Sequence, residues 1–265
     1  MALISKISVK NFNAFNLETA VAILAKAILL GLSLLWPKLG DAQVLWWADH
    51  ETGDMSQWYQ GDPCGGEFNS GISNSEASTD VALSGSYSAK ATISTLDYPV
   101  SGVRLFRWCE PRDNTDTYYS AWYFFPQNYI APNWWNVWQW KSHTPTLNDA
   151  FFLLNIDNRV DDSMYIYLYD WQRKQSYGQS TVNLPVGRWV QLEGYLHCAA
   201  DSSGRVMIWQ DGQLLFDVSG LTTRYSDGDC EWSINNYSDL VDPDPATIYF
   251  DDAAIGLSRI GPPYQ

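Results

Sequence analysis

Short runs of alternating apolar and polar residues fill the chain from about residue 44 to residue 256, and this period of two most limits the fold. The runs include VLWWAD at the start and TIYFDDAAIG at the end, and Gly, Pro, Asn and Asp separate them. Successive side chains of a strand point to opposite faces, and such residues mark turns. No amphipathic helix of useful length follows residue 42. The pattern predicts an all-β fold, a two-sheet antiparallel sandwich.

Two local signals refine this prediction. Asp211 and Gly212 lie between two strand-like runs, and an Asp-Gly pair supplies the positive backbone angles of a type I′ hairpin turn. The segments 61–71 and 241–246 are rich in Gly, Pro and Asp, so we expect them to be loops at the ends of the sandwich.

The first 42 residues differ from the rest. Lys6 and Lys10 precede an apolar run over residues 20–36, and small residues follow it near Gly40 and Ala42. Residues 1–42 therefore read as a signal peptide, or as a membrane anchor if the leader is not cleaved. Residues 43–265 are expected to form one domain, which their length allows. In either case this domain is exported, secreted or held at the cell surface or in the periplasm.

The charge of the chain excludes nucleic acid as a partner. Its formal net charge is −14, with 16 basic and 30 acidic residues. The leader holds four lysines and two acids, so residues 43–265 are near −16 with only three lysines, Lys90, Lys141 and Lys174. Nucleic-acid binding depends on clustered Lys and Arg, which are missing here. A polyanionic substrate would need a locally basic cleft.

Four cysteines, Cys64, Cys109, Cys198 and Cys230, fit export to an oxidising compartment. Their spacing contains no CxxC pair, which argues against zinc and for disulfides. Three pairings are possible. We favour Cys64 with Cys109 and Cys198 with Cys230, because each pair closes a loop between neighbouring segments.

Three runs in the middle of the chain each separate a polar face from an apolar face. The polar faces carry Gln139, Lys141 and His143 in the first run, Leu153, Asn155 and Asp157 in the second, and Tyr165, Tyr167, Tyr169 and Trp171 in the third. Aromatic residues make up 15% of the chain, more than a core needs, and exposed rings stack well on sugars. These faces are interpreted as the lining of a sugar-binding groove. The alternative is a solvent-facing polar row without chemistry.

Other strands add candidates. Arg104 and Arg107 lie on opposite faces of one run, so only one can enter a groove, and we assign Arg107 to it, while Glu110 can pair with the other. On residues 189–197, one face carries Trp189, Gln191 and Glu193, either as groove lining or as a solvated sheet back. Tyr237 is a candidate proton donor or merely an aromatic residue at a strand end.

Acidic residues at the two ends of the domain suggest a structural cation. Terminal strands of such sandwiches often lie side by side, which would bring Glu51 and Gly53 close to Asp251 and Asp252 as oxygen ligands for calcium. The alternative is that they are plain surface acids. No other cofactor is expected. No strand carries the closely spaced pair of carboxylates that glycoside hydrolysis requires, which disfavours that reaction without excluding it.

Four segments, WADHETGDMSQW, VWQWKS, the stretch from LPVGRWVQLEGYL through RVMIWQDGQLLFDVSG, and IYFDDAAIG, together resemble secreted polysaccharide lyases of the heparin lyase I and glucuronan lyase type. The likeness spans residues 47–255. It implies a concanavalin A-like β-jelly roll with a groove on one sheet. The family's Gln-Trp-His triplet matches Gln139 and Trp140, but Lys141 takes the place of the His and His143 follows two residues later. Tyr237 is the counterpart of the family's Tyr.

The resemblance implies β-elimination on a uronate-containing polysaccharide. Such a reaction needs a group that offsets the uronate charge, a base and an acid. We expect Gln139 to offset the charge, Lys141 or His143 to be the base, and Tyr237 the acid. Sugar contacts are expected from Arg107, Asn155, Tyr165, Tyr167, Trp189, Gln191 and Glu193. The alternatives are a non-catalytic carbohydrate-binding or cell-surface structural protein and a glycoside hydrolase.

Overall fold

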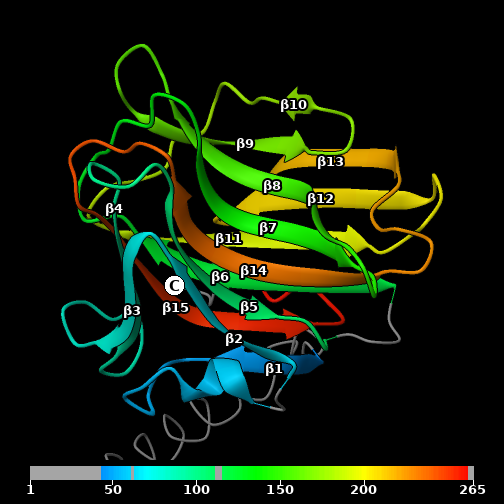
Figure 1. Ribbon diagram of the computed structural model, residues 1–265, viewed down its shortest axis with the longest axis horizontal. Helices are drawn as coiled ribbons and strands as arrows, with labels where there is room; N and C mark the ends of the chain where they lie inside the picture. The colour runs from blue at the N-terminus through cyan, green and yellow to red at the C-terminus, as the bar shows by residue number, and fades with distance from the viewer. Residues whose placement is uncertain (1–42, 61–62, 111–114, 262–265) are drawn as a thin grey trace, which may run out of the picture. The chain divides into compact units, whose positions relative to one another are not determined.

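The computed structural model describes residues 43–60, 63–110 and 115–261, and over these ranges the protein is an all-β sandwich of two antiparallel sheets, as predicted (Figure 1). The expected leader, residues 1–42, lies outside the described residues. Among the residues that are described, no helix is long and apolar enough to cross a membrane.

One sheet has eight strands in the order β13-β12-β11-β6-β15-β4-β3, with β1 added on β15. Its strands are β1 (Val44–Ala48), β3 (Ile72–Ser78), β4 (Ser88–Ser94), β6 (Asp116–Phe124), β11 (Trp189–His197), β12 (Gly204–Gln210), β13 (Gln213–Leu221) and β15 (Ala246–Gly256). The first and last strands of the domain therefore lie side by side, as the sequence predicted.

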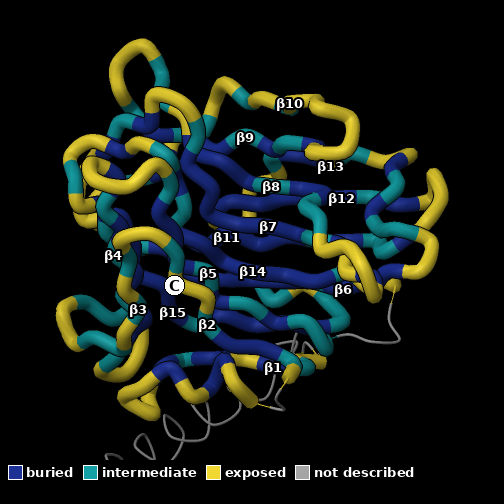
Figure 2. Tube along the Cα trace, in the orientation of Figure 1, coloured by how far each residue is buried: buried dark blue, intermediate teal, exposed yellow. Residues whose placement is uncertain are grey.

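The other sheet has seven strands in the order β10-β9-β8-β7-β14-β5-β2. Its strands are β2 (Gly65–Ser70), β5 (Ser101–Arg107), β7 (Trp135–His143), β8 (Asn148–Asn158), β9 (Met164–Asp170), β10 (Gln175–Tyr177) and β14 (Asp229–Ser238). A short 3-10 helix, η1 (Ser56–Tyr59), precedes β2. The central strands of both sheets are buried and the connecting loops are exposed (Figure 2).

Indole rings fill the space between the sheets. Trp138, Trp140 and Trp232 are almost fully buried, and the ring of Trp138 packs against the other two, with centroids 5.4 Å from Trp140 and 5.1 Å from Trp232. On the facing sheet, Gly194 of β11 leaves room for them. A Cβ atom there would come within 2.6 Å of the Trp140 ring and 2.9 Å of the Trp138 ring. The apolar face of β7 is thereby fixed toward the core, and its other face must point away from it.

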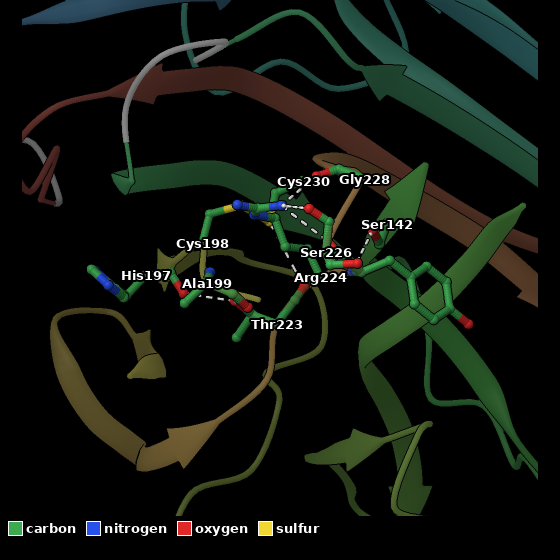
Figure 3. Close-up of a disulfide and its surroundings, with 10 residues drawn as sticks. Ser142, His197, Cys198, Ala199, Thr223, Arg224, Ser226, Gly228 and Cys230 are labelled. Atoms are coloured by element: carbon green, nitrogen blue, oxygen red, sulfur yellow. Dashed lines mark hydrogen bonds between the residues drawn. A yellow bond between two sulfur atoms is a disulfide. The ribbon is translucent and has the colours of Figure 1, made fainter. Parts of the chain in front are cut away.

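Both favoured disulfides are present. Cys64–Cys109 links the segments that flank the neighbouring strands β2 and β5. Cys198 follows β11 and Cys230 lies in β14, so the second bond joins the two sheets (Figure 3). Around it, Thr223 donates a hydrogen bond to the carbonyl oxygen of His197 and accepts one from the amide of Ala199. The loop before β14 is thus bound to the end of β11.

The turn prediction at Asp211 and Gly212 is confirmed, since both have positive φ and they join β12 to β13. The prediction of a loop over 61–71 is wrong for most of that segment, because β2 occupies Gly65–Ser70 and pairs with β5. Gly65 suits this edge strand, because a Cβ would lie 2.4 Å from the Trp58 carbonyl oxygen. Close packing, rather than a turn, explains the glycine.

Candidate active site

The polar faces of β7, β8 and β9 lie together on the side of the seven-stranded sheet that points away from the core. Gln139 pairs across the sheet with Leu153 of β8, which pairs with Tyr169 of β9. Directly paired residues of antiparallel strands project to the same face. The alternation predicted for these strands is confirmed, since the intervening residues of β7 to β9, such as Trp138 and Trp140, are buried in the core.

Two adjoining cavities open on this face, and we call them together the groove. The larger, of about 540 Å³, crosses the sheet from β5 to β10 and is lined by Arg104, Trp134, Asn136, Gln139, Asp149, Ala150, Leu153, Asn155, Tyr167, Tyr169, Trp171, Ser176 and Tyr237. The smaller, of about 330 Å³, is lined by Glu67, Phe68, Arg104, Phe106, Trp108, Lys141, Asn148, Glu231, Trp232 and Ser233. Because Arg104 lines both, the two cavities meet at its side chain.

A chain of side-chain hydrogen bonds connects three residues that line the larger cavity, Asn136, Asn155 and Tyr167, with the buried Asn235. Asn235 donates to Asn136 (2.6 Å), Asn136 donates to Asn155 (3.0 Å), and Asn155 donates to the hydroxyl of Tyr167 (3.1 Å). These residues come from four neighbouring strands, β14, β7, β8 and β9. Each amide is held in one orientation by its neighbours, so the groove presents a fixed polar surface to a ligand.

Lys141 has the environment that a general base needs. Its ammonium group is half-buried in the smaller cavity, and burial lowers its pKa from the usual value near 10.5. Glu231 and Asp149 oppose this shift, whereas the charge of Arg104 adds to it. A lowered pKa means that more of the side chain is the neutral amine, the form that can accept a proton.

Glu231 lies directly across from Lys141 on β14 and was not identified from the sequence. Its side chain is almost fully buried, and burial raises its pKa to about 7 although Lys141 lowers it. One carboxylate oxygen lies 3.0 Å from Nδ1 of His143, which is half exposed at the end of β7. The other accepts a hydrogen bond from Asn148. His143 therefore contacts a carboxylate at the rim instead of lining the groove.

Arg104 and Tyr237 contact each other in the larger cavity. The guanidinium carbon of Arg104 lies 4.0 Å from the centre of the Tyr237 ring and 5.6 Å from that of Phe68. Trp134 packs edge-on against the same tyrosine, with ring centres 4.9 Å apart. Tyr237 pairs with Asn136, five residues from Lys141 along β7, or roughly 16 Å between Cα atoms. Arg104 lines the cavity of Lys141 as well as that of Tyr237.

The structure does not place Arg107 in the groove, so its assignment there is corrected. Its side chain is 2% exposed and donates hydrogen bonds to the carbonyl oxygens of Trp58 and Gln60 and to the carboxylate of Glu110. It is thus the arginine that forms the expected ion pair, and Arg104 is the one that reaches the groove. The sequence placed the two on opposite faces but did not show which face was buried.

Trp189, Gln191 and Glu193 lie on β11 of the other sheet, on its outer face, so their assignment to substrate binding is also corrected. Their neighbours Val190 and Leu192 point into the core. Glu193 accepts hydrogen bonds from Arg259 and from the backbone amide of Ile260, which bind the C-terminal segment. The pattern of β11 indicated two faces correctly, but it could not tell which sheet would form the groove.

The remaining sugar-contact candidates divide between two hollows. Asn155 and Tyr167 line the groove. Tyr165 lies in a neighbouring hollow with residues 158–161, where its hydroxyl donates to Asp157 and the guanidinium of Arg159 covers its ring at 4.2 Å. The structure also adds Asn136, Tyr169 and Trp171 to the groove. Tyr169 and Trp171 were visible as members of the polar face, but nothing in the sequence singled them out.

The acids proposed for calcium are occupied by hydrogen bonds. Glu51 accepts from the backbone amides of Ser86 and Tyr87, and Asp251 accepts from that of Leu83, so both bind the loop before β4. Asp252 accepts from the Ser84 hydroxyl, and Gly53 provides a turn with positive φ. Within the described ranges, no group of three or more His, Cys, Asp or Glu residues could hold a metal ion. The calcium site stays a prediction.

Comparison with known proteins identifies the family. A family model described as polysaccharide lyase matches residues 50–254, most of the chain and all of the groove. The chain belongs to the polysaccharide lyase family. A comparison with curated proteins found no match to this chain. The narrower likeness to heparin lyase I stays a prediction.

Solved structures share the fold of this polysaccharide lyase at low sequence identity. The endo-β-1,4-glucuronan lyase of the fungus Trichoderma reesei is 13% identical, with a TM-score of 0.63 over 82% of this chain and 96% of that one. The cellulose induced protein Cip1 is 16% identical, with a TM-score of 0.58 over 82% and 99%. The PL-14 alginate lyase of Aplysia kurodai is 12% identical, with a TM-score of 0.53 over 81% and 99%. At these identities the likeness shows the jelly-roll fold.

Proposed function

We propose that this polysaccharide lyase cleaves a uronate-containing polysaccharide by β-elimination. The observation that carries the proposal is the groove itself, in which a cation, an amide, a partly desolvated lysine and phenols meet on one sheet face. The glucuronan and alginate lyases with the same fold act on uronate polymers according to their names. Family membership favours this reaction over glycoside hydrolysis, and two disulfides fit an exported protein.

The groove supplies each part of the reaction. Arg104 and Gln139 hold the uronate carboxylate, which offsets the charge that develops when the neighbouring carbon loses its proton. Lys141 as the neutral amine takes that C5 proton. The electron pair of the C5–H bond forms the C4–C5 double bond, and the C4–O4 bond breaks. A phenol donates a proton to the leaving O4, so the charges balance.

We assign proton donation to Tyr237 because its ring contacts Arg104, which holds the uronate carboxylate in this proposal. Tyr169 provides the comparison, since it lies in the same cross-strand row as Gln139. Tyr237→Phe should reduce kcat more than Tyr169→Phe, by about 10²-fold or more for loss of a general acid. The reverse order would transfer the role to Tyr169 and leave the reaction class intact.

The proposal is tested by incubating the purified protein with alginate, glucuronan, heparin and pectate and following the ultraviolet absorbance of the unsaturated product. We expect a rising signal with at least one of these polymers. New reducing ends without this absorbance would identify a hydrolase. Binding without either signal, unchanged in Lys141→Ala, would identify a carbohydrate-binding protein that has lost catalysis.

A further inference from the structure

Positive charge in the groove is confined to a small part of it. Among the residues that line the larger cavity, Arg104 is the only basic one and Asp149 the only acidic one. The other side chains of this cavity are amides, phenols, indoles, a serine, an alanine and a leucine. Among the side chains that line this cavity, a substrate therefore meets one cation, at the end where the two cavities join.

The uncharged part of the groove is long enough for several sugar units. Arg104 lies on β5, and the cavity continues over β14, β7 and β8 to β9. Neighbouring strands are about 4.8 Å apart, so four steps extend roughly 19 Å beyond the strand of the arginine. Over this distance the floor consists of Asn136, Gln139, Leu153, Asn155 and Tyr167.

The other basic residues near the groove lie at its ends or bind neighbouring groups. Lys141 shares the smaller cavity with two acids, Glu67 and Glu231. At the β9 edge, the guanidinium of Arg159 donates to Asn183 and to carbonyl oxygens of residues 179 and 182. Lys174 lies 3.4 Å from the centre of the Trp171 ring, at the far end of the groove. Among the described residues, no basic side chain lines the larger cavity between β14 and β9.

A polymer with a carboxylate on every sugar does not suit this surface. Each carboxylate placed over the middle of the groove would lose water without gaining a partner of opposite charge, which is unfavourable. It would also approach a protein with a formal charge of −14. Uncharged sugars fit better, because their hydroxyls can bond to amides and phenols and their apolar faces can stack on rings.

We propose that the substrate is a polysaccharide in which uronate residues are separated by uncharged sugars. One uronate carboxylate lies at Arg104 and Gln139, and the sugars next to it along β8 and β9 are neutral. This inference rests on the proposed β-elimination and specifies its substrate class.

A matched series of substrates tests the inference. Glucuronan, a polymer of uronate alone, is converted chemically into samples in which an increasing share of carboxyl groups is reduced to alcohols, so that backbone and linkage stay the same. We expect kcat/KM per remaining uronate to rise by about two- to five-fold at intermediate reduction, the scale of one exposed charge interaction, and activity to vanish in the fully reduced sample. A steady fall from the first reduced sample onward would overturn the inference.

A substitution in the groove provides the reciprocal test. Leu153 lies at the middle of the floor, paired with Gln139 on one side and Tyr169 on the other. Leu153→Lys should shift the preference toward unmodified glucuronan by a similar factor, whereas Leu153→Gln, of similar size without charge, should not. Equal effects of the two variants would contradict the charge argument.

The two proposals fail in different ways. Product from unmodified glucuronan, with less from every reduced sample, would refute the substrate class and keep the lyase. If no sample yields unsaturated product, the lyase proposal fails, and retention of the protein in gels that contain each polymer then decides the ligand class. Stronger retention by the partly reduced samples would support it, and stronger retention by glucuronan would refute it.

Discussion

Lys141 is the residue on which the proposed chemistry depends most. Lys141→Ala and Lys141→Arg should both lower kcat/KM by about 10²- to 10⁴-fold, the usual contribution of a general base, because an arginine keeps the charge but cannot give up its proton at working pH. Lys90→Ala is the matched control, since Lys90 pairs with Asp80 on the other sheet. An Arg variant with near-normal activity would show that the positive charge matters and the base lies elsewhere.

Protonation of Lys141 should appear in the pH profile. Because its pKa is lowered by burial, kcat/KM should rise with pH and level off below the ordinary lysine value of 10.5. The Glu231 carboxylate favours the ammonium form, so Glu231→Gln should move this limb to lower pH. His143 contacts Glu231 but not the groove, and His143→Gln should leave the maximal rate close to normal. A limb that does not move in Glu231→Gln would separate Glu231 from the base.

Glu231 also predicts a pH dependence of stability. Its pKa is about 7 in the folded protein and 4.5 in the reference state, so the folded protein holds this proton more tightly. The resulting stabilisation is fully present below pH 4.5 and is lost as the pH rises through 7. Glu231→Gln stays neutral, so the variant should gain stability relative to the wild type between pH 5 and pH 8. Urea unfolding at both pH values measures this, and a constant difference would contradict it.

At the scale of the strand, Gly194 fixes the orientation of β7. Gly194→Ala should lower the free energy of unfolding by about 1–3 kcal/mol, since the added methyl group meets the rings of Trp140 and Trp138 between two sheets. Gly178→Ala is a suitable control because nothing lies within 4 Å of the added atom. Chemical denaturation of both variants provides the measurement. Equal stability of the two would mean that the indoles repack freely.

Strand periodicity predicted which side chains of β7, β8 and β9 share a face, because alternation is a property of one strand alone. It could not predict which sheet faces the ligand. For that reason Glu193 was assigned to the groove, although its strand β11 belongs to the other sheet and its side chain binds Arg259 of the C-terminal segment. Likewise, Glu231 became visible as a partner of Lys141 only when β14 was seen beside β7, 90 positions away in sequence. Pairing between distant strands carries the information that the sequence pattern lacks.

At the scale of the whole molecule, net charge predicts the response to salt. A formal charge of −14 repels an anionic polymer, and the range of this repulsion falls from about 30 Å at 0.01 M salt to about 8 Å at 0.15 M. KM for glucuronan should therefore decrease as salt rises over this interval. A basic cleft that attracts the polymer would give the opposite trend, and initial rates at several salt concentrations distinguish the two.

The sequence predicted the fold class, the disulfide pairing that we favoured among three, and the contact between first and last strands. Each of these follows from features that act over the whole chain: strand period, cysteine spacing and the geometry of a sandwich. The groove required more, because Asn136 and Asn155, which line it, are hydrogen-bonded to each other and Asn136 also to the buried Asn235, on three different strands. Strand alternation identified Asn155 as a candidate, but the hydrogen bonds that join it to Asn136 and Asn235 depend on strand pairing that the sequence does not show.

The most direct test of the account is a crystal structure of Lys141→Ala with a bound oligosaccharide that contains one uronate between neutral sugars. The account predicts the oligosaccharide across β14, β7, β8 and β9, with its carboxylate within hydrogen-bond distance of Arg104 or Gln139 and C5 facing the position of the missing ammonium group. An oligosaccharide bound on the outer face of the eight-stranded sheet, or one in the groove with its carboxylate turned away from both residues, would contradict it.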